Sequence, residues 1–319
     1  MRLVITGSHG LVGTALERTC LLQGHQVIPI DFVRPERRSV ENICDREYLK
    51  TALAECDGIV HLAAISRVAW GEIQPDLCHE INVEGTRAIV DTIASCASPP
   101  WLLFASSREV YGNPSQSIVS EDDAILPVNH YGRSKAEGER LVVESRDAGT
   151  RNAIVRLSNV YGGRRDHPDR AVPSLLSRAL NGSDLTITGS ENYFDFVHVE
   201  DTVLGLLAIV EQLRAGESAL PPIQLTTGIR TTLGELAELA VETTNSTSRI
   251  VKAAPRPFDV SGFCGTNAQA ARLLGWQPQI GLRQGMAAVA ADLLRNGPLA
   301  PIEMPDPTKL AAARAAERL

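Results

Sequence analysis

A tyrosine and a lysine four residues apart, in the segment Tyr131-Gly-Arg-Ser-Lys135, are the side chains of this sequence best placed to move a proton. Side chains at i and i+4 are neighbours on one helix face, so a helix here would bring the phenol and the ammonium together. A phenol ordinarily titrates at about 10, and a nearby positive charge favours its ionised form, which suits acid–base chemistry at neutral pH. Ser107, whose hydroxyl ends a neighbouring apolar run, favours this interpretation over a plain surface pair on a helix.

Three glycines near the start of the chain predict a binding site for a phosphate. Residues 2–6 form a short apolar run that predicts a buried strand, and residues 11–22 predict a helix. Gly7 and Gly10 lie between the predicted strand and the predicted helix, and Gly13 lies in the first turn of that helix. Glycine lets the chain turn tightly and lets a diphosphate approach the backbone and the N–H groups of the helix N-terminus. The spacing Gly-x-x-Gly-x-x-Gly is not the commonest dinucleotide fingerprint, so a plain connecting turn is the alternative.

An acidic residue, Asp31, extends the phosphate interpretation to dinucleotide binding. It ends a second apolar run, residues 26–30, at about the distance along the chain where a carboxylate accepts hydrogen bonds from an adenosine ribose. A carboxylate there repels the 2′-phosphate of NADP, so we expect NAD as the cofactor. Three nearby arginines, Arg34, Arg37 and Arg38, are the argument for the alternative, an NADPH-dependent enzyme.

The composition disfavours several classes of protein. The chain has 319 residues, 44% of them hydrophobic, which is enough for a large core and suggests about two domains. A net charge of −7 argues against a nucleic-acid partner. No apolar run approaches the roughly 20 residues that span a bilayer and no leader precedes the first predicted strand, so we expect a cytoplasmic protein without a membrane partner. The six cysteines show no metal-ligand spacing, so we expect reduced thiols and no metal site.

Strands and helices alternate through the first half of the chain, which predicts an α/β fold with a doubly wound parallel (Rossmann) sheet. We assign residues 1–160 to an NAD-binding domain, whose ligand should lie beyond the C-terminal ends of the strands. Residues 161–297 are expected to form a smaller C-terminal substrate-binding domain, with residues 194–215 returning to the main sheet. Residues 298–319 are assigned to a tail, Pro-rich and then Ala-rich.

Taken together, these features resemble an extended short-chain dehydrogenase/reductase of the NAD-dependent nucleotide-sugar epimerase/dehydratase family. The resemblance spans residues 1 to about 275. Besides Asp31 and Asp45, the matching segments are Thr6-Gly-Ser-His-Gly-Leu-Val-Gly13, His61-Leu-Ala-Ala64, Asn82-Val-Glu-Gly-Thr86, Ser106-Ser-Arg-Glu-Val-Tyr-Gly112, Tyr131 to Lys135, Arg156-Leu-Ser-Asn-Val-Tyr-Gly162, Asp195-Phe-Val-His-Val-Glu-Asp201 and Arg256-Pro-Phe-Asp259.

The resemblance implies which residues hold NAD. Asp31 would hold the adenosine ribose, Asp45 the adenine, and Lys135 the nicotinamide ribose. The full set of implied cofactor positions is Gly7, Gly10, Leu11, Val12, Gly13, Asp31, Asp45, Leu62, Ala63, Asn82, Ser106, Tyr131 and Lys135.

The resemblance also implies the catalytic roles. Tyr131 would take the proton of a sugar hydroxyl as hydride leaves for the nicotinamide, Lys135 would lower the pKa of Tyr131, and Ser107 would hydrogen-bond the reacting oxygen. Glu109 matches the carboxylate that dehydratases and some decarboxylases of the family use near C5. The implied substrate is a nucleotide-diphosphate sugar, and the implied substrate-binding positions are Ser107, Asn159 and Arg256.

Two positions depart from the family pattern. Phe194 stands where the family usually has an arginine aimed at the diphosphate, so that contact is missing or comes from Arg164 or Arg165. Arg108 stands where many sugar 4,6-dehydratases have an acidic residue. Glu109 beside it could form a mere surface ion pair with Arg108. The sequence therefore leaves epimerisation and Glu109-assisted dehydration both open.

The function that follows is an enzyme that oxidises a sugar hydroxyl to a ketone with NAD and returns the hydride after epimerisation or dehydration. One alternative is an NADPH-dependent ketosugar reductase. Another is a non-catalytic NAD(P)-sensing protein, which would have no need of Tyr131, Lys135 and Ser107. Many relatives pair two helices, expected here at residues 77–96 and 131–145, across a dimer interface, so we expect a homodimer.

Overall fold

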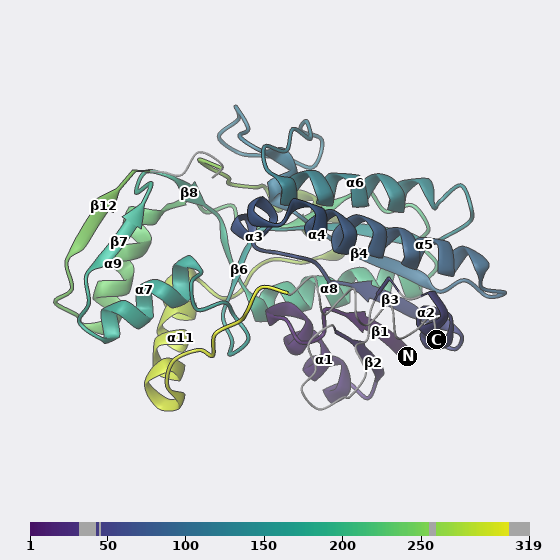
Figure 1. Ribbon diagram of the computed structural model, residues 1–319, viewed down its shortest axis with the longest axis horizontal. Coiled ribbons are helices and arrows are strands. Elements are labelled where there is room, and N and C mark those ends of the chain that lie inside the picture. The colour runs from purple at the N-terminus through teal and green to yellow at the C-terminus, as the bar shows by residue number, and fades with distance from the viewer. Residues whose placement is uncertain (32–42, 45, 255–259, 306–319) are drawn as a thin grey trace.

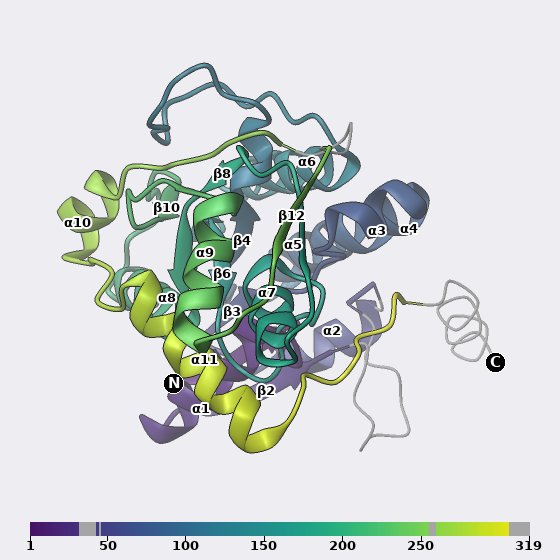
Figure 2. The same ribbon diagram turned by 90° about the vertical axis from the view of Figure 1, so that its left-hand side faces the viewer.

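Six parallel strands form the sheet that carries the larger of two lobes (Figures 1 and 2). The computed structural model describes residues 1–31, 43–44, 46–254 and 260–305. The strands lie in the order β10-β5-β4-β3-β1-β2. Their bounds are β1 (Arg2–Thr6), β2 (Gln26–Ile30), β3 (Gly58–His61), β4 (Trp101–Ser107), β5 (Asn152–Leu157) and β10 (Ile223–Leu225). This sheet confirms the Rossmann-type fold expected from the sequence.

Helices cover both faces of this sheet (Figure 1), and the apolar sequence of β4 shows why. Leu103 and Ala105 pack with helices on one face, whereas Leu102 and Phe104 pack with helices on the other. Because successive side chains of a strand point to opposite faces, a strand that is apolar throughout needs cover on both sides. The covering helices are α1 (Leu11–Leu22) and α8 (Val199–Arg214) on the first face, and α2 (Arg46–Leu53), α5 (Gly85–Ser95) and α6 (His130–Glu144) on the second.

The helix expected at residues 77–96 is divided into three parts. After α3 (Val68–Ile73), the chain forms α4 (Pro75–His79), then one π-helical segment, η1 (Glu80–Glu84), and then α5. The π-helical segment contains Asn82, whose side chain is buried and hydrogen-bonded to a neighbouring loop. Such segments often occur near functional sites, since they shift side chains out of the regular helical register.

The smaller lobe is built on a separate core in which Leu176, Leu236 and Met286 are fully buried. Its helices are α7 (Ala171–Leu180), α9 (Leu233–Thr244) and α11 (Leu282–Asn296), which face the viewer in Figure 2. Its strand pairs are β7 (Leu185–Thr188) with β12 (Ile250–Ala253), and β8 (Tyr193–Phe194) with β11 (Thr231–Thr232).

Residues 194–215 are shared between the lobes. Strand β9 (Phe196–His198) pairs with β6 (Asn159–Tyr161) in a two-stranded sheet of its own, whereas α8 packs on the main sheet. The strand that extends the main sheet comes later, because β10 pairs with β5 and packs against α10 (Ala268–Leu274).

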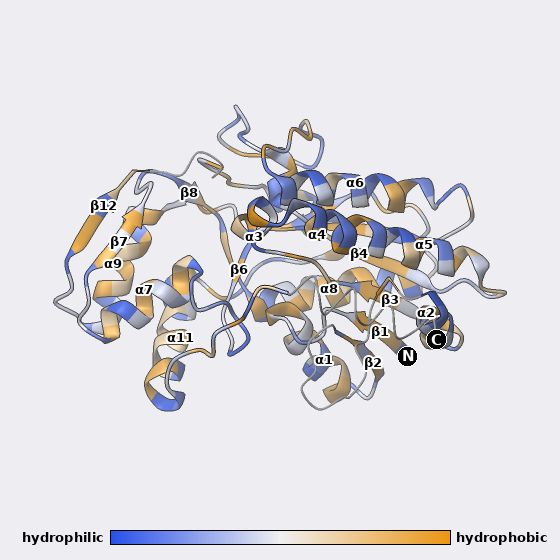
Figure 3. Cartoon of the chain, in the orientation of Figure 1, coloured by the Kyte–Doolittle hydropathy of each residue, from blue (hydrophilic) through white to orange (hydrophobic). Residues whose placement is uncertain are grey.

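Hydropathy follows this architecture. Figure 3 shows that the strands of the central sheet are mainly apolar, whereas polar residues gather along α5 and α6. Within the part of the chain that the structure describes, no helix has both the length and the apolar character needed to cross a membrane.

A buried ion pair fastens α6, the helix that carries Tyr131, to the sheet. Arg156 on β5 donates from Nε and Nη2 to both carboxylate oxygens of Glu139 on α6, at 2.9 and 2.8 Å. The two side chains are only 4% and 5% exposed. Arg156 also donates from Nη1 to the Tyr111 hydroxyl and to the carbonyl oxygen of Glu121, both at 2.9 Å. The charges are therefore paired and hydrogen-bonded away from water, so removal of one leaves the other costly to bury.

We predict that Glu139→Ala lowers the free energy of unfolding by about 3–5 kcal/mol, because it leaves the Arg156 guanidinium buried without its counter-charge. Chemical denaturation followed by circular dichroism measures this change. Glu137→Ala on the same helix is the matched control, since Glu137 pairs with Arg140 on the exposed side of α6 and should contribute less than about 1 kcal/mol. Equal losses in the two variants would contradict the assignment.

Candidate active site

A cavity of about 1510 Å³ lies between the two lobes, at the C-terminal ends of β1, β3, β4 and β5. Most of the site residues expected from the sequence line it. These are Gly7, Gly10, Leu11, Val12, Gly13, Asp31, Leu62, Ala63, Ser106, Ser107, Glu109, Tyr131, Lys135 and Asn159. Two further expected residues, Asp45 and Arg256, lie outside the described residues, as do Arg34, Arg37 and Arg38.

The glycine turn at the start of the chain forms one end of the cavity. Gly7 has φ +70°, and a Cβ placed on it would lie 2.7 Å from the backbone nitrogen of Ala63. A Cβ on Gly13 would lie 2.1 Å from the Gly7 oxygen. Helix α1 starts after Gly10 with no side-chain cap and no acidic residue in its first turn. Because the start of α1 lines the cavity and has no side-chain cap, the cradle fits the pyrophosphate of a dinucleotide.

Asp31 lies beside this turn, directly after β2. Its carboxylate accepts the backbone N–H of His9 at 2.7 Å, which fixes the acidic side chain at the cavity wall. A carboxylate held there suits the hydroxyls of a ribose and repels a 2′-phosphate.

The phenol of Tyr131 and the hydroxyl of Ser107 lie near each other, and both residues line the cavity. Tyr131 lies in the first turn of α6, and Ser107 is the last residue of β4. Burial raises the pKa of Tyr131 to about 12, although the hydrogen bond with Ser107 and the charge of Arg170 act in the opposite direction. In the protein alone, the phenol therefore keeps its proton at neutral pH.

Lys135 follows Tyr131 by one helical turn, but its ammonium points elsewhere. It donates to the carbonyl oxygen of Ala105 at 2.8 Å, and burial lowers the pKa of Lys135 to about 8. That Lys135 lowers the pKa of Tyr131 stays a prediction. Ser106, the next residue of the strand, has a buried hydroxyl with no hydrogen-bond partner among the described residues.

Asn82 differs from the other expected cofactor residues, because it does not line the cavity. Its side-chain oxygen accepts the N–H of Ile65 at 2.7 Å, and its nitrogen donates to the Ser134 hydroxyl at 2.8 Å. The amide is thus occupied behind the cavity wall. Asn82 fixes the loop that follows β3 against α6.

Glu109 and Arg108 form an ion pair at the cavity wall, with 2.7 Å between Oε1 and Nη2. The pair is buried, not the surface pair considered from the sequence, since the side chains are 11% and 7% exposed for Arg108 and Glu109. The other carboxylate oxygen of Glu109 accepts the side-chain N–H of Asn129 at 2.8 Å. Arg108 also donates from Nε to Asn159 at 2.6 Å, and its guanidinium carbon lies 4.5 Å from the centroid of the Phe194 ring.

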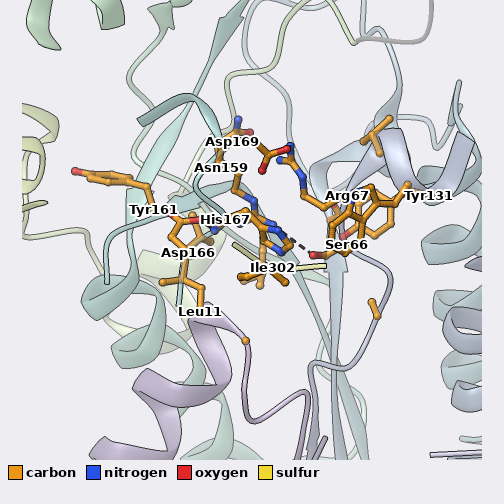
Figure 4. Close-up of a pocket in the computed structure, with 18 of the residues that line it drawn as sticks. Leu11, Ser66, Arg67, Tyr131, Asn159, Tyr161, Asp166, His167, Asp169 and Ile302 are labelled. Atoms are coloured by element: carbon orange, nitrogen blue, oxygen red, sulfur yellow. Dashed lines mark hydrogen bonds and ion pairs between the residues drawn. The ribbon is translucent and has the colours of Figure 1, made fainter. Parts of the chain in front are cut away.

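Ser66 and Arg67, and residues 166–170, which the sequence did not single out, face each other across the cavity (Figure 4). Arg67, after β3, forms an ion pair with Asp169, and Arg170 contacts the Ser66 hydroxyl at 3.4 Å. Beside them, burial raises the pKa of Asp166 to about 6. Residues 164–170 are rich in charge, which is the signal that could have marked this loop.

Arg164 and Arg165, considered from the sequence as phosphate contacts, have different surroundings. Arg164 pairs with Asp292 at 3.2 Å and donates to the carbonyl oxygens of Gly297 and Pro298 at 2.8 and 3.0 Å. It thereby turns the chain after α11, and residues 301–305 continue to the cavity and line it. Arg165 lines the cavity itself.

Comparison with known proteins agrees with this geometry. The family model described as "NAD dependent epimerase/dehydratase family" matches residues 3–220. The UDP-glucose 4-epimerase of Mycolicibacterium smegmatis is 27% identical over 315 residues, which cover 93% of this chain and 99% of that protein. UDP-glucuronic acid decarboxylase 4 of Arabidopsis thaliana is 28% identical, over 92% of this chain and 68% of its own length.

A solved structure extends the similarity to the fold. MoeE5 in complex with UDP-glucose and NAD is 26% identical, with a TM-score of 0.85, and covers 92% of this chain and 99% of its own. The same protein has been solved with UDP-glucuronic acid and NAD. The chain thus has the same fold as this protein. It belongs to the NAD dependent epimerase/dehydratase family and is an NAD-dependent enzyme of the extended short-chain dehydrogenase/reductase type.

Proposed function

We propose that this enzyme inverts a hydroxyl-bearing carbon of a UDP-linked sugar through a transient keto-sugar. The observation that carries the proposal is the meeting of the Tyr131 phenol and the Ser107 hydroxyl in a cavity that ends at the glycine cradle. The names of the relatives, which include UDP-glucose epimerases and UDP-glucuronic acid decarboxylases, support a UDP-linked sugar as substrate.

Tyr131, Ser107 and Lys135 have separate roles in the proposed oxidation. When bound, NAD supplies the hydride acceptor, and its cationic ring adds to the charges that favour the phenolate of Tyr131. Tyr131 takes the proton of the sugar hydroxyl and later returns it, and Ser107 holds the reacting oxygen. Lys135, fixed by the carbonyl of Ala105, is placed to hold the nicotinamide ribose.

The surroundings of Glu109 support epimerisation over dehydration. A dehydratase takes a proton from the carbon next to the ketone, for which it needs a carboxylate with an available oxygen. Here one oxygen of Glu109 pairs with Arg108 and the other accepts from Asn129. Both oxygens of Glu109 thus contact buried donors, one of them cationic, which supports an ion-pairing role for this carboxylate.

A homodimer in the cytoplasm is part of the same proposal. Helices α5 and α6 lie side by side on the outer face of the sheet (Figure 1), where many relatives of this type pair. All six cysteines, each within the described residues, are thiols and not disulfides, which is usual in a reducing compartment. Light scattering on the purified protein measures the state of assembly.

We predict that Tyr131→Phe lowers turnover by at least about 10²-fold, because the ring stays and only the proton-transferring hydroxyl is lost. Affinity for NAD and the thermal unfolding temperature should stay near those of the wild type. Tyr193→Phe, which changes a tyrosine outside the cavity, is the matched control and should remain active. If Tyr131→Phe kept most of its activity, the assignment of Tyr131 as the acid–base group would be wrong.

We predict that Asp31→Ala narrows the preference for NAD over NADP by about tenfold or more, since it removes both the ribose acceptor and the charge that repels a 2′-phosphate. Calorimetric titration with each cofactor gives the ratio. Asp57→Ala removes a similar carboxylate, bonded to the backbone N–H of Arg2 at 2.7 Å, from the opposite end of β1. That control should leave the ratio unchanged, and tighter binding of NADP by the wild type would reverse the cofactor preference.

We predict that wild-type enzyme in deuterium oxide converts UDP-glucose or UDP-glucuronate to a product with one inverted centre and no deuterium at C5. Epimerisation returns the same hydride and removes no proton from carbon. Proton NMR of the product measures both features. A dehydrated product carrying solvent deuterium would overturn epimerisation and would make Glu109 the base.

A further inference from the structure

We infer that Arg108 is a specificity-determining residue, whose guanidinium binds an anionic oxygen group of the substrate. This group is either the carboxylate of a uronic acid or the diphosphate. The inference rests on the proposed function, since it names a contact with a UDP-linked sugar, but it concerns recognition and not the redox step.

The first observation is that the guanidinium is held rigidly at the cavity wall. Arg108 opens the 3₁₀ turn η2 (Arg108–Tyr111), directly after Ser107. Its Nη2 is paired with Glu109, its Nε donates to Asn159, and its plane packs against Phe194. These contacts come from three separate segments of the chain, so the orientation is set before any ligand arrives. A preorganised guanidinium loses little freedom when it binds an anion.

The second observation is an unused donor. A guanidinium has five N–H donors in a planar fork. The bonds to Glu109 and Asn159 use Nη2 and Nε, whereas Nη1 of Arg108 is buried and has no hydrogen-bond partner among the described residues. Buried donors in folded proteins are nearly always satisfied, by protein, by water or by a ligand. Because Arg108 lines the cavity, a substrate oxygen is a suitable acceptor for this nitrogen.

The third observation is the local charge. The chain as a whole carries a net charge of −7, yet the charges that line the cavity are balanced. The positive groups are Arg67, Arg108, Lys135, Arg165 and Arg170, and the carboxylates are Asp31, Glu109, Asp166, Asp169 and Glu303. A lining that does not share the negative excess of the chain opposes an anionic ligand less than the rest of the surface does.

The place of Arg108 beside the reacting group favours the carboxylate. Arg108 adjoins Ser107, whose hydroxyl lies near the phenol of Tyr131. A guanidinium one residue from this point reaches substituents of the sugar ring that reacts. The unused Nη1 can donate one charge-assisted hydrogen bond to such a carboxylate.

A purely structural role is the alternative that the experiment must separate. Arg108 could serve only to neutralise Glu109 and to hold Asn159 in place. Loss of Arg108 would then lower the affinity of the cavity for all of its ligands, including NAD. Two variants are therefore needed: Arg108→Gln, and the double variant Arg108→Gln/Glu109→Gln, which leaves no buried charge unpaired.

The experiment is calorimetric titration of the NAD-loaded enzyme with UDP, UDP-glucose and UDP-glucuronate. We expect both variants to lose about tenfold or more in affinity for UDP-glucuronate, as usual for one charge-assisted hydrogen bond, while UDP and UDP-glucose change less than about twofold. Arg283→Gln, which removes an exposed arginine paired with Glu242, is the matched control and should bind all three ligands as the wild type does.

Each other outcome has a defined meaning. An equal loss for all three ligands with unchanged NAD affinity supports the diphosphate as the anionic group. Unchanged affinities in the double variant overturn the inference, and so does a parallel loss of NAD affinity, since it marks a structural role. Because the readout is binding and not turnover, a wild-type enzyme that binds none of the three ligands would count against the proposed function and not specifically against Arg108.

Discussion

The side-chain amide of Asn129 sets the distance between the two groups on which the proposed chemistry depends. Its oxygen accepts the N–H of Gly132 at 2.7 Å and so starts α6, and its nitrogen donates to Glu109 at 2.8 Å. Tyr131 lies in the first turn of that helix, and Ser107 lies two residues before Glu109. One fully buried amide thus joins the beginning of α6 to the end of β4. Away from water, such bonds are strong and costly to leave unmade, which makes the joint rigid.

The burial that makes this joint rigid also opposes the ionisation of Tyr131 and of Lys135. It raises the pKa of Tyr131 to about 12 and lowers that of Lys135 to about 8, so both groups are moved toward their neutral forms. The phenol then depends on positive charge from elsewhere to become a base. Arg170, which precedes α7 in the smaller lobe, is one such charge. The phenol proposed as the acid–base group in one lobe is therefore within electrostatic reach of an arginine of the other lobe.

Phe194 lines the same cavity, and its aromatic ring provides a surface on which Arg108 packs. Where the family pattern has an arginine, this chain presents an apolar face, and the guanidinium of Arg108 packs on it at 4.5 Å. The positive charge is thus present close to this position, but it comes from the end of β4 and is tied to Glu109. Two departures that look independent in the sequence are one structural feature.

Local patterns in the sequence were enough to predict much of the fold and the cofactor end of the site. Runs of apolar residues mark the strands of the sheet, and the glycine spacing marks the turn at Gly7, because both depend on backbone conformation within a few residues. The i, i+4 spacing of Tyr131 and Lys135 likewise placed both side chains in one cavity. Such features need no knowledge of distant partners. The irregular backbone at Asn82 was not predicted, since the bonds of its amide to Ile65 and Ser134 are made across the fold.

The sequence by itself determined the family, the parallel sheet, the phosphate turn and the pair of residues on α6, since each is encoded in a short stretch of chain. Only the tertiary structure decided how the charged residues are paired. Glu109 could be a base or an ion-pair partner, and in the folded chain it is the partner of Arg108, an arginine that also contacts Asn159 of β6 and Phe194 of β8. Residues 301–305 reach the cavity only because Arg164 turns the chain after α11. These contacts join residues far apart in sequence, and their choice of partner depends on which surfaces the folded core brings together.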